Sequence, residues 1–281
     1  MATTSVALAL SAANIAPAEA ATIKRTIDFE NRVNGQGQLR NAREGTIVDN
    51  EWEQWGVSLS TNDGHGLTLF DSDCYLHSCS GGDDDLASGS AYGTDSQGNV
   101  LIIQENGKKN SRGNRFSNPD DKGSGGTITF DFFNPDPDQY QRNEVTLGKI
   151  ALLDLDDSDR GNVWIKAFTS SGDEVVKRLF ETNSNGSLKK QNGDYVIADG
   201  VMINDTSVYD FNDAKGDNSL WEFDFGGLEN VVKLDVVFPG SGAIAYVEYE
   251  QEEQEIPEPG LTLGLLALGA FGSRSVLKRK K

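Results

Sequence analysis

The feature that most constrains the fold is a series of short apolar stretches in residues 21–250, each ended by a cluster of Gly, Asn, Asp or Ser. Apolar and polar side chains alternate in residues 127–133, and the same period of two recurs in residues 221–225 and 232–238. Successive side chains of a β-strand point to opposite faces, so this alternation is typical of strands with one buried face. No helical period is sustained over many turns. The sequence therefore predicts an all-β domain.

Eight further stretches have the same character and bring the predicted strands to eleven. They are residues 23–29, 57–60, 67–70, 100–104, 150–155, 163–169, 175–180 and 243–249. This number of short strands, joined by turns such as Asn185-Gly186, predicts a two-sheet antiparallel β-sandwich that is jelly-roll-like. We expect one helical turn at residues 51–55. Residues 106–126, rich in Gly, Asn and Ser, are expected to form a long surface loop or a disordered insertion.

The charge balance excludes several classes of protein. With 44 acidic and 25 basic side chains the chain carries −19, and a strongly acidic surface repels a phosphate backbone, which argues against nucleic-acid binding. The absence of several apolar runs of about 20 residues argues against a polytopic membrane protein. The first 20 residues contribute −1 and residues 257–281 contribute +4, so the central part carries −22.

The N-terminus has features of a secretory signal peptide, which we predict to span residues 1–20. A short apolar stretch at residues 6–10 precedes Ala18 and Ala20, which form an A-x-A cleavage pattern, so the mature chain should begin at Ala21. No Lys or Arg precedes the apolar stretch, which indicates a misplaced start codon or a weak signal. The alternative is a disordered or helical N-terminus of a cytosolic protein.

The C-terminus, residues 257–281, has three parts in a fixed order. Pro257, Glu258 and Pro259 come first, and an apolar run of 12 residues at 261–272 follows. A basic cluster then closes the chain: Arg274, Lys278, Arg279, Lys280 and Lys281. We expect the run to be a short hydrophobic helix that enters the inner membrane only transiently, because its 12 residues are fewer than the roughly 17 needed to span a bilayer. The basic end should stay in the cytoplasm by the positive-inside rule.

This order resembles the PEP-CTERM sorting signal of Gram-negative bacteria. The resemblance implies export to the cell envelope, cell surface or extracellular matrix, and processing near Pro257 by an exosortase, a membrane protease-transpeptidase. It also implies an association with exopolysaccharide and biofilm. The alternative is an amphipathic or disordered C-terminus. Residues 251–256 are acidic and are predicted to be a linker between residues 21–250 and the signal.

The central domain is similar to other exported bacterial β-sandwich proteins that carry this tail. The similar stretches are residues 70–73 followed by 81–86, residues 152–156 before a Val-rich strand, and residues 240–244 before the last strand. The resemblance implies a jelly-roll fold of unassigned function.

Two groups of carboxylates are candidate calcium ligands, because calcium takes six to eight oxygen ligands and often takes them from loops. The first group is Asp71, Asp73, Asp83, Asp84 and Asp85, and the second is Asp154, Asp156, Asp157 and Asp159. Neither group matches an EF-hand. The alternative for each is a solvated acidic loop that keeps the protein soluble.

Cys74 and Cys79 are the only two cysteines, and in an oxidising compartment we expect them to form a disulfide that stiffens the first acidic loop. The alternatives are two free thiols, or a zinc site that adds His77 and His65. The spacing fits no standard zinc pattern.

Catalytic motifs are scarce, since neither a Gly-x-Ser-x-Gly elbow nor a His-Glu-x-x-His helix is present. A pair of catalytic carboxylates of the glycosidase type remains an alternative, because the distance between two such residues is determined by the fold and not by their spacing in the sequence. Aromatic side chains that could stack on sugars are Trp52, Trp55, Tyr75, Tyr92 and Trp164, with core packing as the alternative for each.

We therefore expect a non-enzymatic protein of the cell surface or extracellular matrix. The first alternative is a calcium-dependent, lectin-like carbohydrate-binding module, and the second is a glycoside hydrolase. A domain that carries −22 would repel an anionic polysaccharide unless calcium bridged the two.

Overall fold

The computed structural model describes residues 22–34, 36, 38–74, 78–135, 142–155, 162–191, 194–203 and 218–252. One compact unit, Lys24–Gln251, holds nearly all of them; a second unit, Met1–Ile23 with Glu252–Lys281, contributes only residues 22, 23 and 252. The predicted signal peptide, C-terminal helix and sorting signal lie outside the described residues. Among the helices of the described part, none has the length and apolar character to cross a membrane.

The described residues form sixteen strands and three short 3-10 turns. The strands are β1 (Thr22–Ile27), β2 (Asn31–Val33), β3 (Leu39–Asn41), β4 (Ile47–Val48), β5 (Val57–Ser60), β6 (Leu67–Asp71), β7 (Asn99–Ile103), β8 (Gly126–Phe132), β9 (Val145–Leu153), β10 (Trp164–Thr169), β11 (Glu174–Arg178), β12 (Lys190–Gln191), β13 (Asp194–Tyr195), β14 (Val201–Ile203), β15 (Leu220–Phe238) and β16 (Ala243–Glu252). The turns are η1 (Glu53–Trp55), η2 (Ser80–Gly82) and η3 (Asp84–Leu86). Every predicted strand overlaps an observed one, and the all-β prediction is confirmed. Strand β16 also runs two residues into the predicted acidic linker.

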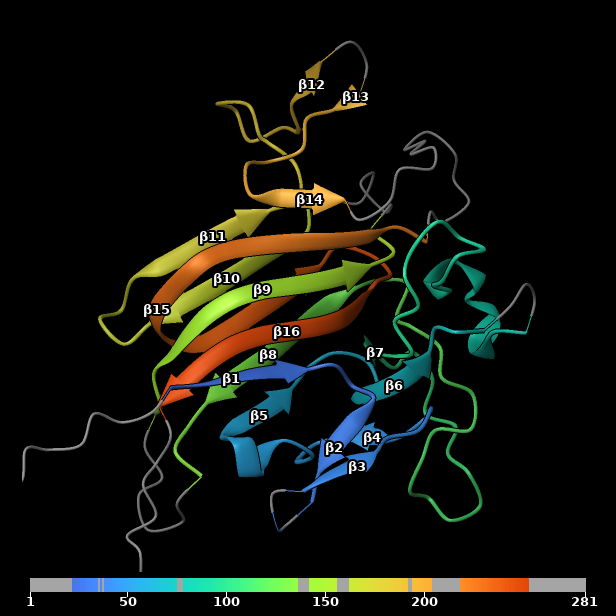
Figure 1. Ribbon diagram of the computed structural model, residues 1–281. Helices are drawn as coiled ribbons and strands as arrows, with labels where there is room; N and C mark the ends of the chain where they lie inside the picture. Colours follow the sequence, from blue (N-terminus) through green and yellow to red (C-terminus); the bar gives the residue numbers. More distant parts are fainter. Residues whose placement is uncertain are drawn as a thin grey trace, which may run out of the picture. The chain divides into compact units, whose positions relative to one another are not determined.

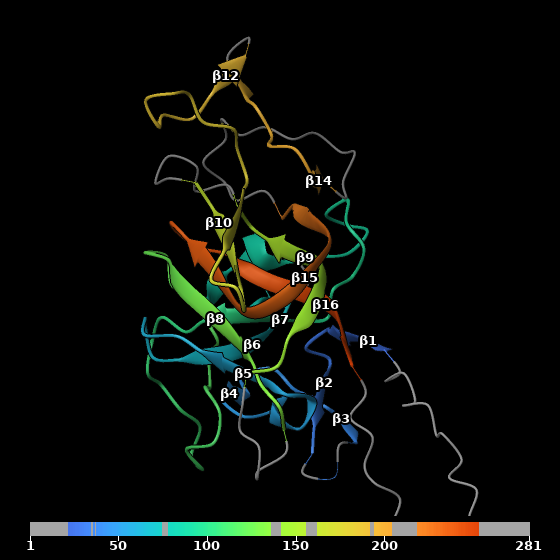
Figure 2. The same cartoon turned by 90° about the vertical axis from the view of Figure 1, so that its left-hand side faces the viewer.

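Twelve strands form one continuous antiparallel sheet, in which the long strand β15 changes partners along its length (Figure 1). Residues 220–224 pair with β9, whereas residues 233–238 pair with β8. β10 also pairs with this second half of β15, and β14 pairs with the first half. Figure 2 shows β15 curling back between these halves. The strand therefore belongs to both layers of a sandwich-like fold.

The two layers enclose one main apolar core. The Phe132 ring of β8 lies 5.3 Å from the Tyr249 ring of β16, measured between centroids, so side chains of the two layers meet. Ile128, Phe130 and Phe132 of β8 are buried, as the alternation predicts. Burial of such large apolar side chains is the main source of stability for a sheet of this kind.

A second, smaller core lies on the other face of the sheet, at β6, β7, β9 and β16. Val100 and Ile102 of β7 belong to it, whereas Leu101 and Ile103 belong to the main core, so this strand is buried on both faces. The loop between β6 and β7 supplies its outer side chains: Cys79, Leu86 and Ala87. This loop is therefore packed onto the sheet rather than extended into solvent, so its side chains have defined positions.

Candidate functional site

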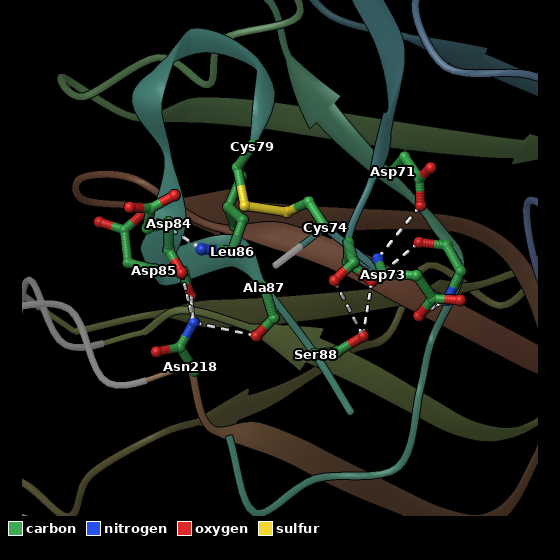
Figure 3. The surroundings of a disulfide bond; sticks show 12 residues. Asp71, Asp73, Cys74, Cys79, Asp84, Asp85, Leu86, Ala87, Ser88 and Asn218 are labelled. Atoms are coloured by element: carbon green, nitrogen blue, oxygen red, sulfur yellow. Dashed lines mark hydrogen bonds between the residues drawn. A yellow bond between two sulfur atoms is a disulfide. The ribbon is translucent and has the colours of Figure 1, made fainter. Parts of the chain in front are cut away.

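The disulfide predicted from the sequence lies in the loop between β6 and β7. Cys74 and Cys79 are joined, with 5.0 Å between their Cα atoms (Figure 3). The zinc and free-thiol alternatives therefore do not apply to these two cysteines. Cys79 is buried in the second core together with Leu86, so the bond ties the loop to its own apolar anchor.

A single amide holds the middle of this loop close to the start of β15. The Nδ2 group of Asn218, just before β15, donates to the carbonyl oxygens of Asp84 at 2.7 Å, Asp85 at 2.8 Å and Ala87 at 2.9 Å (Figure 3). Asn218 has a φ of 51°, a left-handed conformation in which Asn is several-fold enriched over other side chains. Three carbonyls of the η3 turn thus depend on one side chain more than 130 residues away in sequence.

The five aspartates of the first acidic group do not converge. Asp71 accepts from the backbone N–H of Asp73 at 3.1 Å, and Asp73 accepts from the Ser96 hydroxyl. Figure 3 shows both on one side of the disulfide, with Asp84 and Asp85 on the other. Among the described residues, no three Asp, Glu, His or Cys side chains are grouped so as to hold a metal ion. Calcium binding by this group therefore stays a prediction.

The second acidic group is described only in part. Asp154 follows β9 and is buried, whereas Asp156, Asp157 and Asp159 lie outside the described residues, so calcium binding there stays a prediction.

The structure brings together a different pair of carboxyl groups, Asp83 and Asp121, which the sequence did not indicate. The backbone N–H of Asp121 donates to Asp83 Oδ2 at 3.1 Å, and Asp121 Oδ2 accepts from the N–H of Gly242 at 2.8 Å. Asn118 accepts from the N–H of Gly81 at 3.2 Å. These contacts join three segments that are distant in sequence: the η2–η3 loop, the loop before β8 and the turn before β16. We call this set of contacts the carboxyl junction.

Acidic neighbours crowd the carboxyl junction. Burial raises the pKa of Asp83 to about 8, and the nearby charges of Asp121, Asp120 and Asp85 add to the rise. Burial likewise raises the pKa of Asp121 to about 7, helped by Asp85, Asp120 and Glu105 and opposed by the hydrogen bond from Gly242. Because like charges this close disfavour double ionisation, the pair holds a proton at neutral pH.

Residues 106–126 contribute Asn118 and Asp121 to the carboxyl junction, although the composition of this segment indicated only a surface loop or a disordered insertion. The described loop is fastened to the domain by isolated bridges, such as Gln104 with Asp121 and Thr46 with Arg115, and by the buried ring of Phe116. The surface-loop alternative is therefore the correct one. Asp121 is only 7% exposed, and nothing in its polar surroundings in the sequence marks it as buried.

A pocket of about 280 Å³ opens beside the disulfide. Its walls include Tyr92, Asp73 and Cys74, with the hydroxyl-bearing residues Ser88 and Ser96. Tyr92 is half-buried and packs against the second core, which gives its ring a fixed position. The pocket thus combines an aromatic ring, a carboxylate and hydroxyl groups at close range.

The other aromatic candidates for sugar stacking differ in position. Trp52 is only 1% exposed and meets the Phe29 ring edge-on at 5.4 Å, so it is a core side chain and cannot stack on a sugar. Trp55 and Trp164 are half-buried, and Arg25 lies 4.8 Å above the Trp55 ring. Tyr75 lies outside the described residues, as does His77; His65 is exposed.

No protein family matches the chain, and no characterised protein or solved structure matches it either.

Proposed function

We propose that the protein is exported and works without catalysis at the cell surface or in the extracellular matrix, sorted through its C-terminal tail by an exosortase. The observation that carries the proposal is the paired Cys74 and Cys79 in the packed β6–β7 loop, since disulfides persist in oxidising compartments outside the cytoplasm. The Pro257-Glu258-Pro259 tail supplies the route, and the resemblance to PEP-CTERM proteins associates it with exopolysaccharide and biofilm.

Replacing Pro257, Glu258 and Pro259 together with alanine should trap most of the protein in the inner membrane, because the processing enzyme no longer finds its signal. Cell fractionation and immunoblotting measure the distribution, and N-terminal sequencing of the envelope fraction should find Ala21 first. The matched control replaces the preceding residues Gln254, Glu255 and Ile256 with alanine and should sort normally. Unchanged sorting of the first variant would contradict the proposal.

A second candidate function, carbohydrate binding, is favoured by the pocket beside the disulfide. Aromatic rings stack on the apolar faces of sugars, and Tyr92 presents such a ring next to the Asp73 carboxylate and the Ser88 and Ser96 hydroxyls. The sequence predicts that such binding depends on calcium, and the next experiment includes that test.

A glycan array should show a preferred neutral sugar, and Tyr92→Ala should weaken its binding about tenfold, which corresponds to roughly 1.4 kcal/mol. Tyr92→Phe keeps the ring and should bind within about twofold of the wild type. Running the array with and without calcium tests the calcium dependence that the sequence predicts. Release of reducing sugar from the bound glycan would instead indicate a hydrolase, and equal binding by Tyr92→Ala would contradict this use of the pocket.

A further inference from the structure

A second pocket, of about 300 Å³, lies along the β11 edge of the sheet, far along the chain from the disulfide loop. Its walls come from the end of β11, from residues 180–182 and from residues 198–199. Lys177 and Arg178 contribute cationic groups, and Glu181 and Asp199 contribute carboxylates. In a domain with so large an acidic excess, two adjacent cations at a pocket wall need an explanation.

The sheet holds the Arg178 side chain in a defined orientation. Arg178 and Trp164 are paired across β11 and β10, so their side chains point to the same face. The guanidinium carbon of Arg178 lies 4.2 Å from the centre of the Trp164 indole. Stacking of this kind immobilises the planar guanidinium and leaves its N–H groups directed outward from their rim, within the plane.

The hydrogen-bonding capacity of this guanidinium is largely unused within the described part of the chain. Nη1 donates to Thr182 Oγ1 over a long 3.4 Å, and the buried Nε has no acceptor. No ion pair of the described residues includes Arg178. The two Nη groups carry four of the five N–H bonds of the guanidinium, and only one of these is directed at Thr182 Oγ1, so the others can donate to an incoming oxygen atom.

The charges around the pocket select the kind of anion. Glu181 is already ion-paired with Lys189. Lys177, Arg178 and Lys189 set against Glu181 and Asp199 leave one positive charge in excess. A group with one negative charge, such as a single carboxylate, would match this balance, whereas a doubly charged phosphate or sulfate group would be repelled by the two carboxylates.

We propose that this pocket binds a monoanionic sugar acid, the uronate unit of an acidic polysaccharide, with Arg178 donating from its two Nη groups to the two carboxylate oxygens. A planar carboxylate accepts two parallel hydrogen bonds from a guanidinium. The proposal rests on the proposed location at the cell surface. It also removes the need for calcium as a bridge, because the pocket offers local positive charge within an acidic domain.

Titration of the purified full chain with digalacturonate, followed by calorimetry, tests the proposal. Wild-type protein should bind digalacturonate at least tenfold more tightly than the matching neutral disaccharide. Arg178→Lys keeps the charge but loses the paired donors, and should bind at least tenfold more weakly. Lys190→Gln, which removes an exposed cation outside the pocket, is the control and should bind within about twofold of the wild type.

Asp199→Asn keeps the proposal testable if Arg178 variants unfold, because Asp199 is exposed and its neutralisation should tighten binding severalfold. Equal affinity of the wild type and Arg178→Lys, or of the acidic and neutral disaccharides, would overturn the proposal. Tighter binding of inorganic phosphate than of digalacturonate would also overturn it. Since the protein is purified, failure here leaves the sorting experiment, and with it the proposed location, unaffected.

Discussion

Raising the pH from 5 to 8.5 should lower the free energy of unfolding by roughly 2 kcal/mol, because the carboxyl junction must then lose its proton. A carboxyl group whose pKa is higher in the folded state than in the unfolded chain binds protons more tightly when folded. Stability is therefore greatest near the unfolded-state pKa of about 4 and falls as the pH rises towards the folded-state values, about 7 for Asp121 and about 8 for Asp83.

The size of this effect follows from Asp121, which is almost fully buried. One pKa unit corresponds to roughly 1.4 kcal/mol, so the interval between pH 5 and a pKa of about 7 sets an upper limit of about 3 kcal/mol for this residue in this pH range. Water that enters as the junction ionises should reduce the loss to roughly two thirds of that limit. The neighbouring carboxylates Asp85 and Asp120 cannot compensate, because they carry the same charge.

Chemical unfolding measured at several pH values checks this prediction. Asp121→Asn keeps an oxygen that can accept from Gly242 and removes one of the two titrating groups, so the contribution of Asp121 to the pH dependence should disappear. Asn118→Ala is the control: it removes the contact with Gly81 in the same junction but no titratable group. It should lower stability by a similar amount at every pH. An Asp121→Asn variant with the wild-type pH dependence would show that the junction is not the cause.

The alternation of apolar and polar residues was enough to predict the strands of four or more residues, but not their continuity, and it missed the short strands β2, β3, β4, β12, β13 and β14. Residues 221–225 and 232–238 were predicted as two strands because Gly226, Gly227 and Asn230 interrupt the pattern between them. These three residues adopt left-handed φ angles, and the pairing of β15 with β9 shifts register there. The interruption is thus a set of bulges that bends one strand between two layers. Alternation cannot separate such a bend from a turn, because both break the period of two.

The parts of the site that are local in sequence could be predicted, and those that depend on folding could not. Cys74 and Cys79 are five residues apart and are the only two cysteines, so their pairing could be predicted for an oxidising compartment. Asp83 and Asp121 are 38 residues apart in two polar loops, and only the packing of the loops brings them together. The aspartate groups were conspicuous by composition, yet composition carries no information about which side of the disulfide each one faces.

Asn218→Asp should destabilise the protein by about 3 kcal/mol or more at pH 7, although it only replaces the side-chain NH2 group by an oxygen atom of similar size. The amide of Asn218 satisfies the carbonyl oxygens of Asp84, Asp85 and Ala87. A carboxylate in its place offers no donor and directs negative charge at three oxygen atoms, which adds repulsion to the loss of the hydrogen bonds. Guanidinium unfolding of the two proteins measures the difference.

Two further variants separate the causes. Asn218→Ala removes the donors without adding charge and should cost about 1–3 kcal/mol, less than Asn218→Asp. The matched control is Asn183→Asp, in which the amide donates to Ser187 and Leu188 in an exposed turn. Water can replace that amide, so the control should cost less than about 1 kcal/mol. If Asn218→Asp were no worse than this control, the η3 turn would be held by its apolar anchor Leu86 and not by the amide. The Tyr92 pocket, which lies in the same β6–β7 loop, should then keep its sugar affinity in all three variants.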